Sequence, residues 1–315
     1  MQTYILNRLG HAAVTLAIVS VITFLIVNLS PGGFVIEGAS GMSREDMERI
    51  RENLGLNLPL HVQYWRWSTG ILTGDMGKSL TDGQAVSELI WERLGATFSL
   101  AIIAMVTAVV LGVFLGVLCA VRAYSWFDNL VSGLSFVGLA IPIFWLGILL
   151  ILLFSVQLGW LPSNGLVTLG KENDPWDRVK HMILPATVLA LSSLPQLLRF
   201  TRSSLLEVLN QEYVRTARAK GLYEWMVLFQ HALRNALIPV ITIVGLQLPR
   251  LVGGAAVAET VFGWPGIGRL AVTSAFRRDY PVIMGITIVI SIAVLLSNLL
   301  VDLLYAVVNP RVELG

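Results

Sequence analysis

The sequence is short of charge, cysteine and histidine. Charged residues make up 13% of its 315 residues, about half of the roughly 25% found in soluble domains. The single cysteine, Cys119, excludes an intramolecular disulfide, and the four histidines lack the spacing of a metal site. A net charge of only +2 implies no charge-driven partner. These shortages exclude a disordered chain, a soluble enzyme and a nucleic-acid-binding protein.

Apolar residues are abundant: 55% of the residues are hydrophobic, and the mean hydropathy is +0.74. A helix needs about 20 mostly apolar residues to cross the hydrocarbon core of a bilayer. Six nearly charge-free runs approach or exceed this length: 9–36 (apolar to about 28), 94–121, 129–156, 181–198, 235–262 and 280–301. The third run is expected to be one helix that ends near Val156. The pattern predicts an all-α, polytopic membrane protein with six transmembrane helices.

Basic residues set the expected orientation, because short cytoplasmic loops carry an excess of lysine and arginine. Loop 199–235 has six basic and three acidic residues, whereas segment 31–97 has six basic and nine acidic ones. We therefore expect both termini in the cytoplasm. The chain divides into a first transmembrane helix (1–30), an extracytoplasmic segment with short helices (31–97) and a core of five transmembrane helices (98–315), which includes the cytoplasmic loop 200–235.

The extracytoplasmic segment carries helix signals of its own. Ser43 followed by Asp46 is typical of a helix start, and Gly55 is placed as the C-terminal cap. Aromatic residues follow at 64–67. We expect a small helical cap, and the alternative is a solvated loop with aromatics at the membrane interface.

The cytoplasmic loop reads as two short helices joined at Gly221, which is placed as a left-handed cap. In the first helix, Thr216 and Ala217 contribute to a face of small residues that would let a partner's backbone approach. The second helix has an expected apolar stripe at helical spacing: Leu222, Trp225, Met226 and Phe229. Such a unit has little core of its own, which favours docking into a partner's groove. A basic connecting loop that only follows the charge bias fits the periodicity equally well.

Helix ends and packing residues give further expectations. Pro239 is expected in the first turn of the fifth helix, where its missing N–H costs little. Trp160 and Trp264 stand beside loop breakers and are interpreted as interface anchors. Gly112 and Gly116 predict close helix packing, either within the chain or against a second subunit.

The stretch 215–221 (RTARAKG), followed by 231–239 (HALRNALIP), resembles the signature loop of permease subunits of ABC importers. The general pattern is Glu-Ala-Ala, three residues, Gly, nine residues and Ile-x-Leu-Pro; this chain keeps Ala217, Gly221 and, displaced by one, Pro239. The departure resembles the dipeptide/oligopeptide branch, which also includes nickel and glutathione permeases. Further segments resemble this branch along nearly the whole chain: 4–9, 54–60, 74–79, 142–145, 183–185, 259–268, 278–281, 301–305 and 309–311. Pro-Gly-Gly at 31–33 departs from the usual Pro-Gly-Asp-Pro.

The resemblance implies a type I importer permease in a bacterial or archaeal cytoplasmic membrane. Such a subunit forms half of a path for short peptides that an external binding protein delivers. The implied partners are a second homologous permease and two cytoplasmic ATPase subunits, which bind ATP and magnesium. No catalytic, cofactor or metal site is expected in this chain, and Gly77-Lys78-Ser79 lacks the remaining glycine of a phosphate-binding loop. The implied coupling loop contains the following residues: Arg215, Thr216, Ala217, Arg218, Gly221, Leu222, Trp225 and Pro239.

Three ionisable residues in or near the spans are candidates for the path or a gate: Arg250, Glu259 and Asp302. Charges inside a membrane usually face a cavity or a partner. Arg250 either attracts a carboxylate of the cargo or pairs structurally with an acid such as Glu259. Asp302 is interpreted as interfacial or helix-pairing, with gating as the alternative.

Two alternatives for the function remain. The first keeps the architecture and changes the cargo to nickel, glutathione or another small solute. The second is a secondary transporter or channel that acts alone, which would need acids in several spans or inverted repeats. Neither feature is evident in the sequence.

Overall fold

The computed structural model describes residues 2–29, 48, 52, 55 and 57–308, except for the side chains of 2–5, 248–254 and 303–308. The described residues form helices and one isolated bridge between Lys78 and Ala85, with no strand among them. The predicted all-α class is confirmed. The chain groups into two compact units: unit 1 contains residues 1–96 and 265–295, and unit 2 contains residues 97–264 and 296–315.

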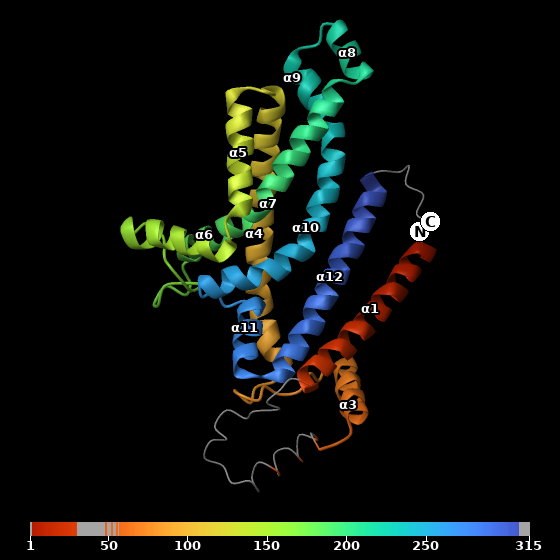
Figure 1. Ribbon diagram of the computed structural model, residues 1–315, viewed down its shortest axis with the longest axis vertical. Coiled ribbons are helices and arrows are strands. Elements are labelled where there is room, and N and C mark those ends of the chain that lie inside the picture. Colours follow the sequence, from red (N-terminus) through yellow and green to blue (C-terminus); the bar gives the residue numbers. More distant parts are fainter. Residues whose placement is uncertain (1, 30–47, 49–51, 53–54, 56, 309–315) are drawn as a thin grey trace. The chain divides into compact units, whose positions relative to one another are not determined.

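Five of the predicted spans coincide with long helices (Figure 1): α1 (Gln2–Leu29), α4 (Val86–Val121), α7 (Pro175–Leu209), α10 (Arg234–Val261) and α12 (Tyr280–Val308). Within the described part of the chain, five helical stretches are long and apolar enough to cross a membrane. The remaining predicted span is a bent pair of helices, and it brings the total to six if it is counted as one span.

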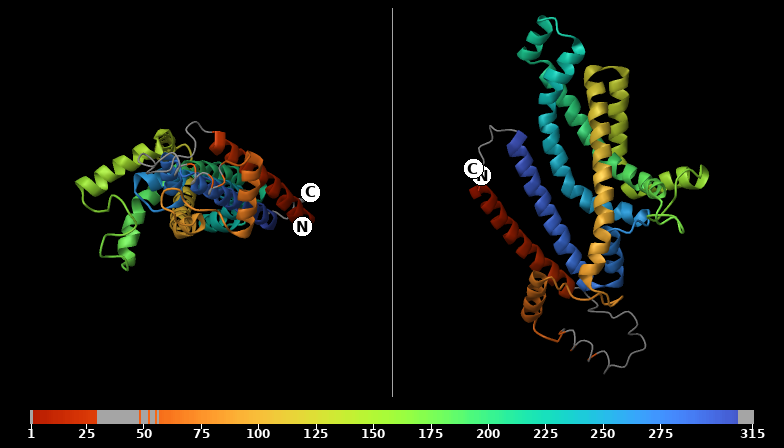
Figure 2. Two further views of the ribbon diagram at one scale, coloured as in Figure 1. Left: turned by 90° about the horizontal axis from the view of Figure 1, so that it is seen from below. Right: turned by 180° about the vertical axis from the view of Figure 1, so that it is seen from behind.

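The bent pair corrects the expectation of one straight helix over 129–156. α5 (Trp126–Ala140) is followed by α6 (Ile143–Leu150), which continues as the π-helical segment η2 (Ile151–Gln157), and the two parts are bent by 105°. The cause is Pro142, because a proline ring disfavours the helical conformation of the preceding residue. Ile141 accordingly has φ −80° and ψ 123°. Figures 1 and 2 show α6 leaving the direction of α5.

Unit 1 is held together by aromatic and aliphatic contacts. Segment 31–97 contributes α3 (Leu60–Thr73), whereas most of the helix predicted from Ser43 lies outside the described residues. Tyr64 of α3 packs edge-on against Phe24 of α1, with ring centroids 5.4 Å apart, and shares a 2.8 Å hydrogen bond with the Ser20 hydroxyl. A second cluster joins Val86 and Ile90 of α4 to α11 (Ile267–Arg277) and α12. The predicted aromatic segment therefore packs α3 onto α1.

Unit 2 is built around α7, in which 16 of the 35 residues are buried. α4 approaches α7 at Gly112 and Gly116, where an added Cβ would come within 2.7 Å of Leu197 Cβ and 2.6 Å of Thr201 Cβ. The glycine pair therefore serves packing within the chain, which decides the alternative that the sequence left open.

Trp264 is fully buried, so its interpretation as an interface anchor is wrong. Gly263 has φ +57°, and the Trp264 N–H donates to the Glu259 carbonyl at 2.8 Å. Trp160 is 65% exposed, as an anchor would be.

Candidate functional site

The loop between α7 and α10 forms a small helical projection at one end of unit 2 (Figure 1). It contains α8 (Glu212–Ala219), the short helix α9 (Glu224–Met226) and the π-helical segment η3 (Val227–Leu233), which runs into α10. Gly221 has φ +77°, and its N–H donates to the Arg218 carbonyl at 2.9 Å. A left-handed residue is nearly free of steric cost only for glycine. The predicted helix–glycine–helix arrangement is confirmed.

The loop has a small core that the sequence did not indicate. Val214 and Val227 are completely buried and Ala217 is 7% exposed, and the three residues pack together with Leu222 at the edge of the cluster. Ala217 therefore faces the interior of the loop, whereas Thr216 of the same predicted face is exposed. Only part of the predicted face is available to a partner.

The four residues of the predicted apolar stripe do not lie on one regular helix, because Leu222 precedes α9 and Phe229 lies in η3. Trp225 and Phe229 are 58% and 56% exposed, and the inward residue is Val227. The reason is η3: a π-helical segment has more residues per turn, so side chains after Met226 leave the 3.6-residue register. Aromatic side chains consequently cover the outside of the loop.

Polar contacts fix the loop on both sides of the turn. The Arg218 guanidinium donates from Nη2 to Glu224 Oε1 at 2.6 Å, which ties the end of α8 to the start of α9. This hydrogen bond raises the pKa of Arg218 and lowers the pKa of Glu224 relative to their ordinary values, because it stabilises both charged groups. Asn235 at the start of α10 donates to the Tyr213 hydroxyl at 2.9 Å. Arg215 makes an exposed ion pair with Glu212, which contributes little.

Pro239 does not lie in the first turn of its helix, as the sequence analysis expected. α10 begins at Arg234 and follows directly on η3, so Pro239 is an internal residue of a longer helical stretch. Its ring removes one helical hydrogen-bond donor. The prediction was wrong because α10 begins five residues before Pro239 and follows directly on η3, whose residues had been assigned to the second helix of the loop.

The candidate path residues have different environments. Glu259 is completely buried, and the Thr97 hydroxyl of α4 donates to its Oε1 at 2.6 Å. Asp302 is half-buried in α12. Arg250 belongs to α10, and its side chain lies outside the described residues. The burial of Glu259 supports a structural role for this carboxylate, while the roles of Arg250 and Asp302 stay predictions.

One ion pair in unit 2 was not predicted. Arg202 of α7 donates from Nε and Nη2 to the two oxygens of Asp128 in α5, both at 2.6 Å, and Asp128 is 1% exposed. The Tyr124 N–H donates to the same carboxylate at 2.8 Å. A cavity of about 500 Å³ lies beside the pair, between α5 and α7. The sequence contains one indication of a polar site here, because Ser125 and Asp128 have the spacing of a helix start and the Ser125 hydroxyl caps α5. No residue near them in the sequence indicates that Arg202 is the partner of Asp128.

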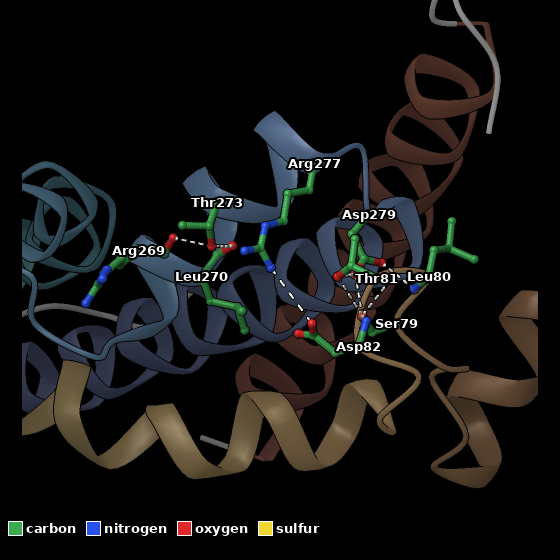
Figure 3. Close-up of polar contacts among 9 residues, drawn as sticks. All are labelled: Ser79, Leu80, Thr81, Asp82, Arg269, Leu270, Thr273, Arg277 and Asp279. Carbon is green, nitrogen blue, oxygen red and sulfur yellow. Dashed lines mark hydrogen bonds and ion pairs between the residues drawn. The ribbon is translucent and has the colours of Figure 1, made fainter. Parts of the chain in front are cut away.

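A second buried carboxylate, Asp279, organises the polar end of unit 1. It precedes α12 and is 2% exposed. The hydroxyls of Ser79 and Thr81 donate to its Oδ2, the latter at 3.0 Å, and the Leu80 N–H donates to Oδ1 at 3.1 Å (Figure 3). These three bonds join the loop before α4 to the turn between α11 and α12. In the sequence, Ser79 belonged to a segment that resembles the permease branch and to an incomplete phosphate-binding motif, and neither pattern indicated Asp279 as its partner.

The chain matches a known family over most of its length. Residues 112–314 match the family described as binding-protein-dependent transport system inner membrane component, and residues 1–101 match the N-terminal family of the same systems. The chain belongs to this family. It is a permease of the ABC importer class and a multi-pass protein of the bacterial inner membrane.

Similar proteins carry names from one group of importers. The chain is 46% identical to the oligopeptide transport system permease protein AppB of Bacillus subtilis, over 99% of this chain and 100% of that protein. It is 41% identical to the dipeptide transport system permease protein DppB of Escherichia coli and 44% identical to the glutathione transport system permease protein GsiC of Salmonella typhimurium, each over 99% of both chains.

A solved structure shares the fold. A chain of the MetNI methionine ABC transporter in an inward-facing conformation gives a TM-score of 0.57 at 20% identity, over 70% of this chain and 96% of that chain. The expected type I permease fold is thereby confirmed.

Proposed function

We propose that this chain forms half of the translocation path for short peptides in an ATP-driven importer. The names of the relatives support the cargo, because oligopeptide and dipeptide permeases match over the whole chain. The proposed assembly contains a second homologous permease, two cytoplasmic ATPase subunits that bind ATP and magnesium, and an external binding protein. The energy comes from the ATPases, and this chain supplies path and coupling.

The observation that carries the proposal is the folded α8–α9 loop with its exposed aromatic side chains. Tyr223, Trp225 and Phe229 are 74%, 58% and 56% exposed, and aromatic residues are enriched at the centres of protein interfaces. The loop has its own buried core and an ion pair across its turn, so it can transmit force as a unit. η3 joins the loop directly to α10. Closure of the ATPases would thus rock the attached helices as rigid bodies.

The test uses the complete complex in proteoliposomes, with ATP inside and the binding protein outside. Labelled dipeptides and longer peptides should accumulate only when both ATP and the binding protein are present. Glutathione and nickel serve as parallel cargoes. Uptake by the permease alone, without any need for ATP, would overturn the importer in favour of a secondary transporter or channel. Accumulation of only glutathione or only nickel would keep the assembly and replace the peptide cargo.

A loop variant tests the coupling residues in the same vesicles. Trp225→Ala with Phe229→Ala should weaken association with the ATPase subunits, because two large side chains leave the exposed surface. Trp160→Ala is the matched control, since Trp160 is similarly exposed in the loop after η2, on the other side of the predicted topology. Unchanged ATPase association in the loop variant would remove these aromatics from the docking surface.

A further inference from the structure

An arginine-lined groove of about 290 Å³ lies along α11 in unit 1, and its polar lining comes from Asp82, Arg93, Arg269, Thr273 and Arg277. Figure 3 shows four of these side chains, those of Asp82, Arg269, Thr273 and Arg277. Three of these five side chains carry a guanidinium and one carries a carboxylate. The lining is therefore positive, although the chain as a whole has a net charge of only +2.

The arginines of α11 share one face of the helix. Arg269, Thr273 and Arg277 follow at intervals of four residues, and all three are exposed. The opposite face carries Ile267 and Ser274, which are buried against the rest of unit 1. α11 is thus anchored by one side and presents its arginines on the other.

The groove is held in place by buried polar contacts. Asp279 follows α11 directly and receives hydrogen bonds from Ser79, Leu80 and Thr81. Asp82 continues this same loop and lies 3.8 Å from the Arg277 guanidinium, with both side chains about half exposed. Arg93 at the start of α4 is directed by a 2.8 Å hydrogen bond from Nη1 to the Leu89 carbonyl, and its Nη1 also lies 3.4 Å from Glu92. The positive lining is therefore pre-organised.

The chemistry of the lining selects its ligand. Guanidinium groups bind carboxylates through paired, charge-assisted hydrogen bonds. The groove is a surface feature and not an enclosed chamber, because the Arg277 side chain is 52% exposed and the neighbouring Phe276 is 87% exposed. Arginine beside an exposed aromatic residue is typical of protein interfaces. These properties fit acidic side chains on a protein surface better than a single small molecule.

We propose that this groove docks an acidic patch of the external binding protein. The inference rests on the proposed function and on the predicted topology, which places segment 31–97 and loop 262–280 on the extracytoplasmic side. Carboxylates of the partner would pair with Arg269 and Arg277 on α11. Arg93 on α4 also lines the groove and adds positive charge. Complementary charge of this kind increases association rates and fixes the docking orientation.

The test is the double variant Arg269→Gln/Arg277→Gln in the complete complex, titrated with the binding protein. The concentration of binding protein that gives half-maximal stimulation of ATP hydrolysis should rise about tenfold or more. Saturating binding protein should recover the rate. Raising the salt concentration should weaken wild-type docking more than docking of the variant. The control is Arg178→Gln/Lys180→Gln, which removes two exposed charges from the predicted same side, outside the groove, and should behave like wild type.

A charge swap sharpens the assignment. Arg277→Glu should weaken docking further, and an acid-to-lysine change in the patch of the binding protein should restore it. An unchanged half-saturation in the double variant would overturn the proposal. So would an equal shift in the control pair, a defect seen only with anionic phospholipid vesicles, or a defect seen only with peptides that have a free C-terminal carboxylate. A wild-type complex that no binding protein stimulates would instead refute the proposed function, so the two failures are distinguishable.

Discussion

α8 and α11 are short helices that end in the same way but for different reasons. Each is followed by a residue in the left-handed region: Gly221 with φ +77° after α8, and Arg278 with φ +56° after α11. Glycine adopts this conformation without steric cost, whereas an L residue with a side chain pays about 1–2 kcal/mol. The turn after α8 is therefore encoded locally, and the turn after α11 is imposed by its surroundings. The Asp279 hydrogen bonds, one residue beyond Arg278, provide the restraint.

The comparison predicts that the turn after α11 loses its conformation when the hydrogen bonds to Asp279 are removed. Asp279→Ala leaves two hydroxyls and one N–H in unit 1 without their acceptor, which should destabilise this unit by about 2–4 kcal/mol. The measurement is the apparent melting temperature of the purified complex, followed by proteolysis of the loop before α4. Asp82→Ala is the control, because this exposed carboxylate makes only a 3.8 Å ion pair. A melting temperature equal to that of the control would show that the buried bonds do not hold the turn.

The turn after α8 should lose its conformation only when Gly221 itself is replaced. Gly221→Val forces a β-branched residue into φ +77° and should cost about 2 kcal/mol within the loop. We expect binding-protein-stimulated ATP hydrolysis and uptake to fall together, because the loop no longer matches the ATPase surface. Gly221→Asn is the matched control, since asparagine tolerates the left-handed region and an added Cβ meets nothing within 4 Å. If valine and asparagine behave alike, the conformation of this turn does not matter for coupling.

The ion pair across the same turn should have a smaller effect. Arg218→Met keeps a long side chain but removes the partner of Glu224, which is 68% exposed. Exposed pairs contribute about 0.2–1 kcal/mol, so coupling should weaken without being lost, and most visibly at low salt. Arg215→Met tests an ion pair of greater exposure in the same helix. A total loss of uptake with Arg218→Met would mean that Arg218 contacts the ATPase itself.

The smallest effect should come from relieving the strained turn. Arg278→Gly removes a side chain from φ +56° and should stabilise unit 1 by up to about 1 kcal/mol, partly offset by the greater freedom of glycine when unfolded. The measurement is again the apparent melting temperature. Gly221→Ala should change it in the opposite direction by a similar amount. A destabilised Arg278→Gly variant would show that the arginine side chain contributes contacts that outweigh the strain.

Local features of the sequence predicted much of this fold correctly. Charge-free runs located the spans, because a bilayer requires about 20 apolar residues wherever a helix crosses it. Gly221 marked the turn of the loop, because its conformational freedom belongs to the residue itself. Pro142 also carried a local signal for the bend in the third span, since proline restricts the residue before it. The apolar residues continue without a charge on both sides of Pro142, and for this reason the span was predicted as one helix.

The directions of side chains were predicted less well. Phe229 was placed by a 3.6-residue period, which ends at Met226 because the π-helical segment η3 follows. Ala217 was placed on a face for a partner, although it packs against Val214 and Val227 inside the loop. Trp264 was assigned to a membrane interface from its neighbours along the chain, although its side chain is completely buried. Periodicity fixes which residues share a face only while the helix keeps its regular geometry.

The sequence by itself determined the class of the protein, the positions of five long apolar helices and the position of the turn at Gly221, because these depend on composition and on single residues. Only the tertiary structure decided the partners of the buried carboxylates. Asp128 meets Arg202 across 74 residues, and Asp279 meets Ser79 across 200. Such pairs depend on which helices lie side by side and on how each is rotated. Packing of the whole chain sets these properties, because the cost of burying an unpaired charge is avoided only where distant segments meet.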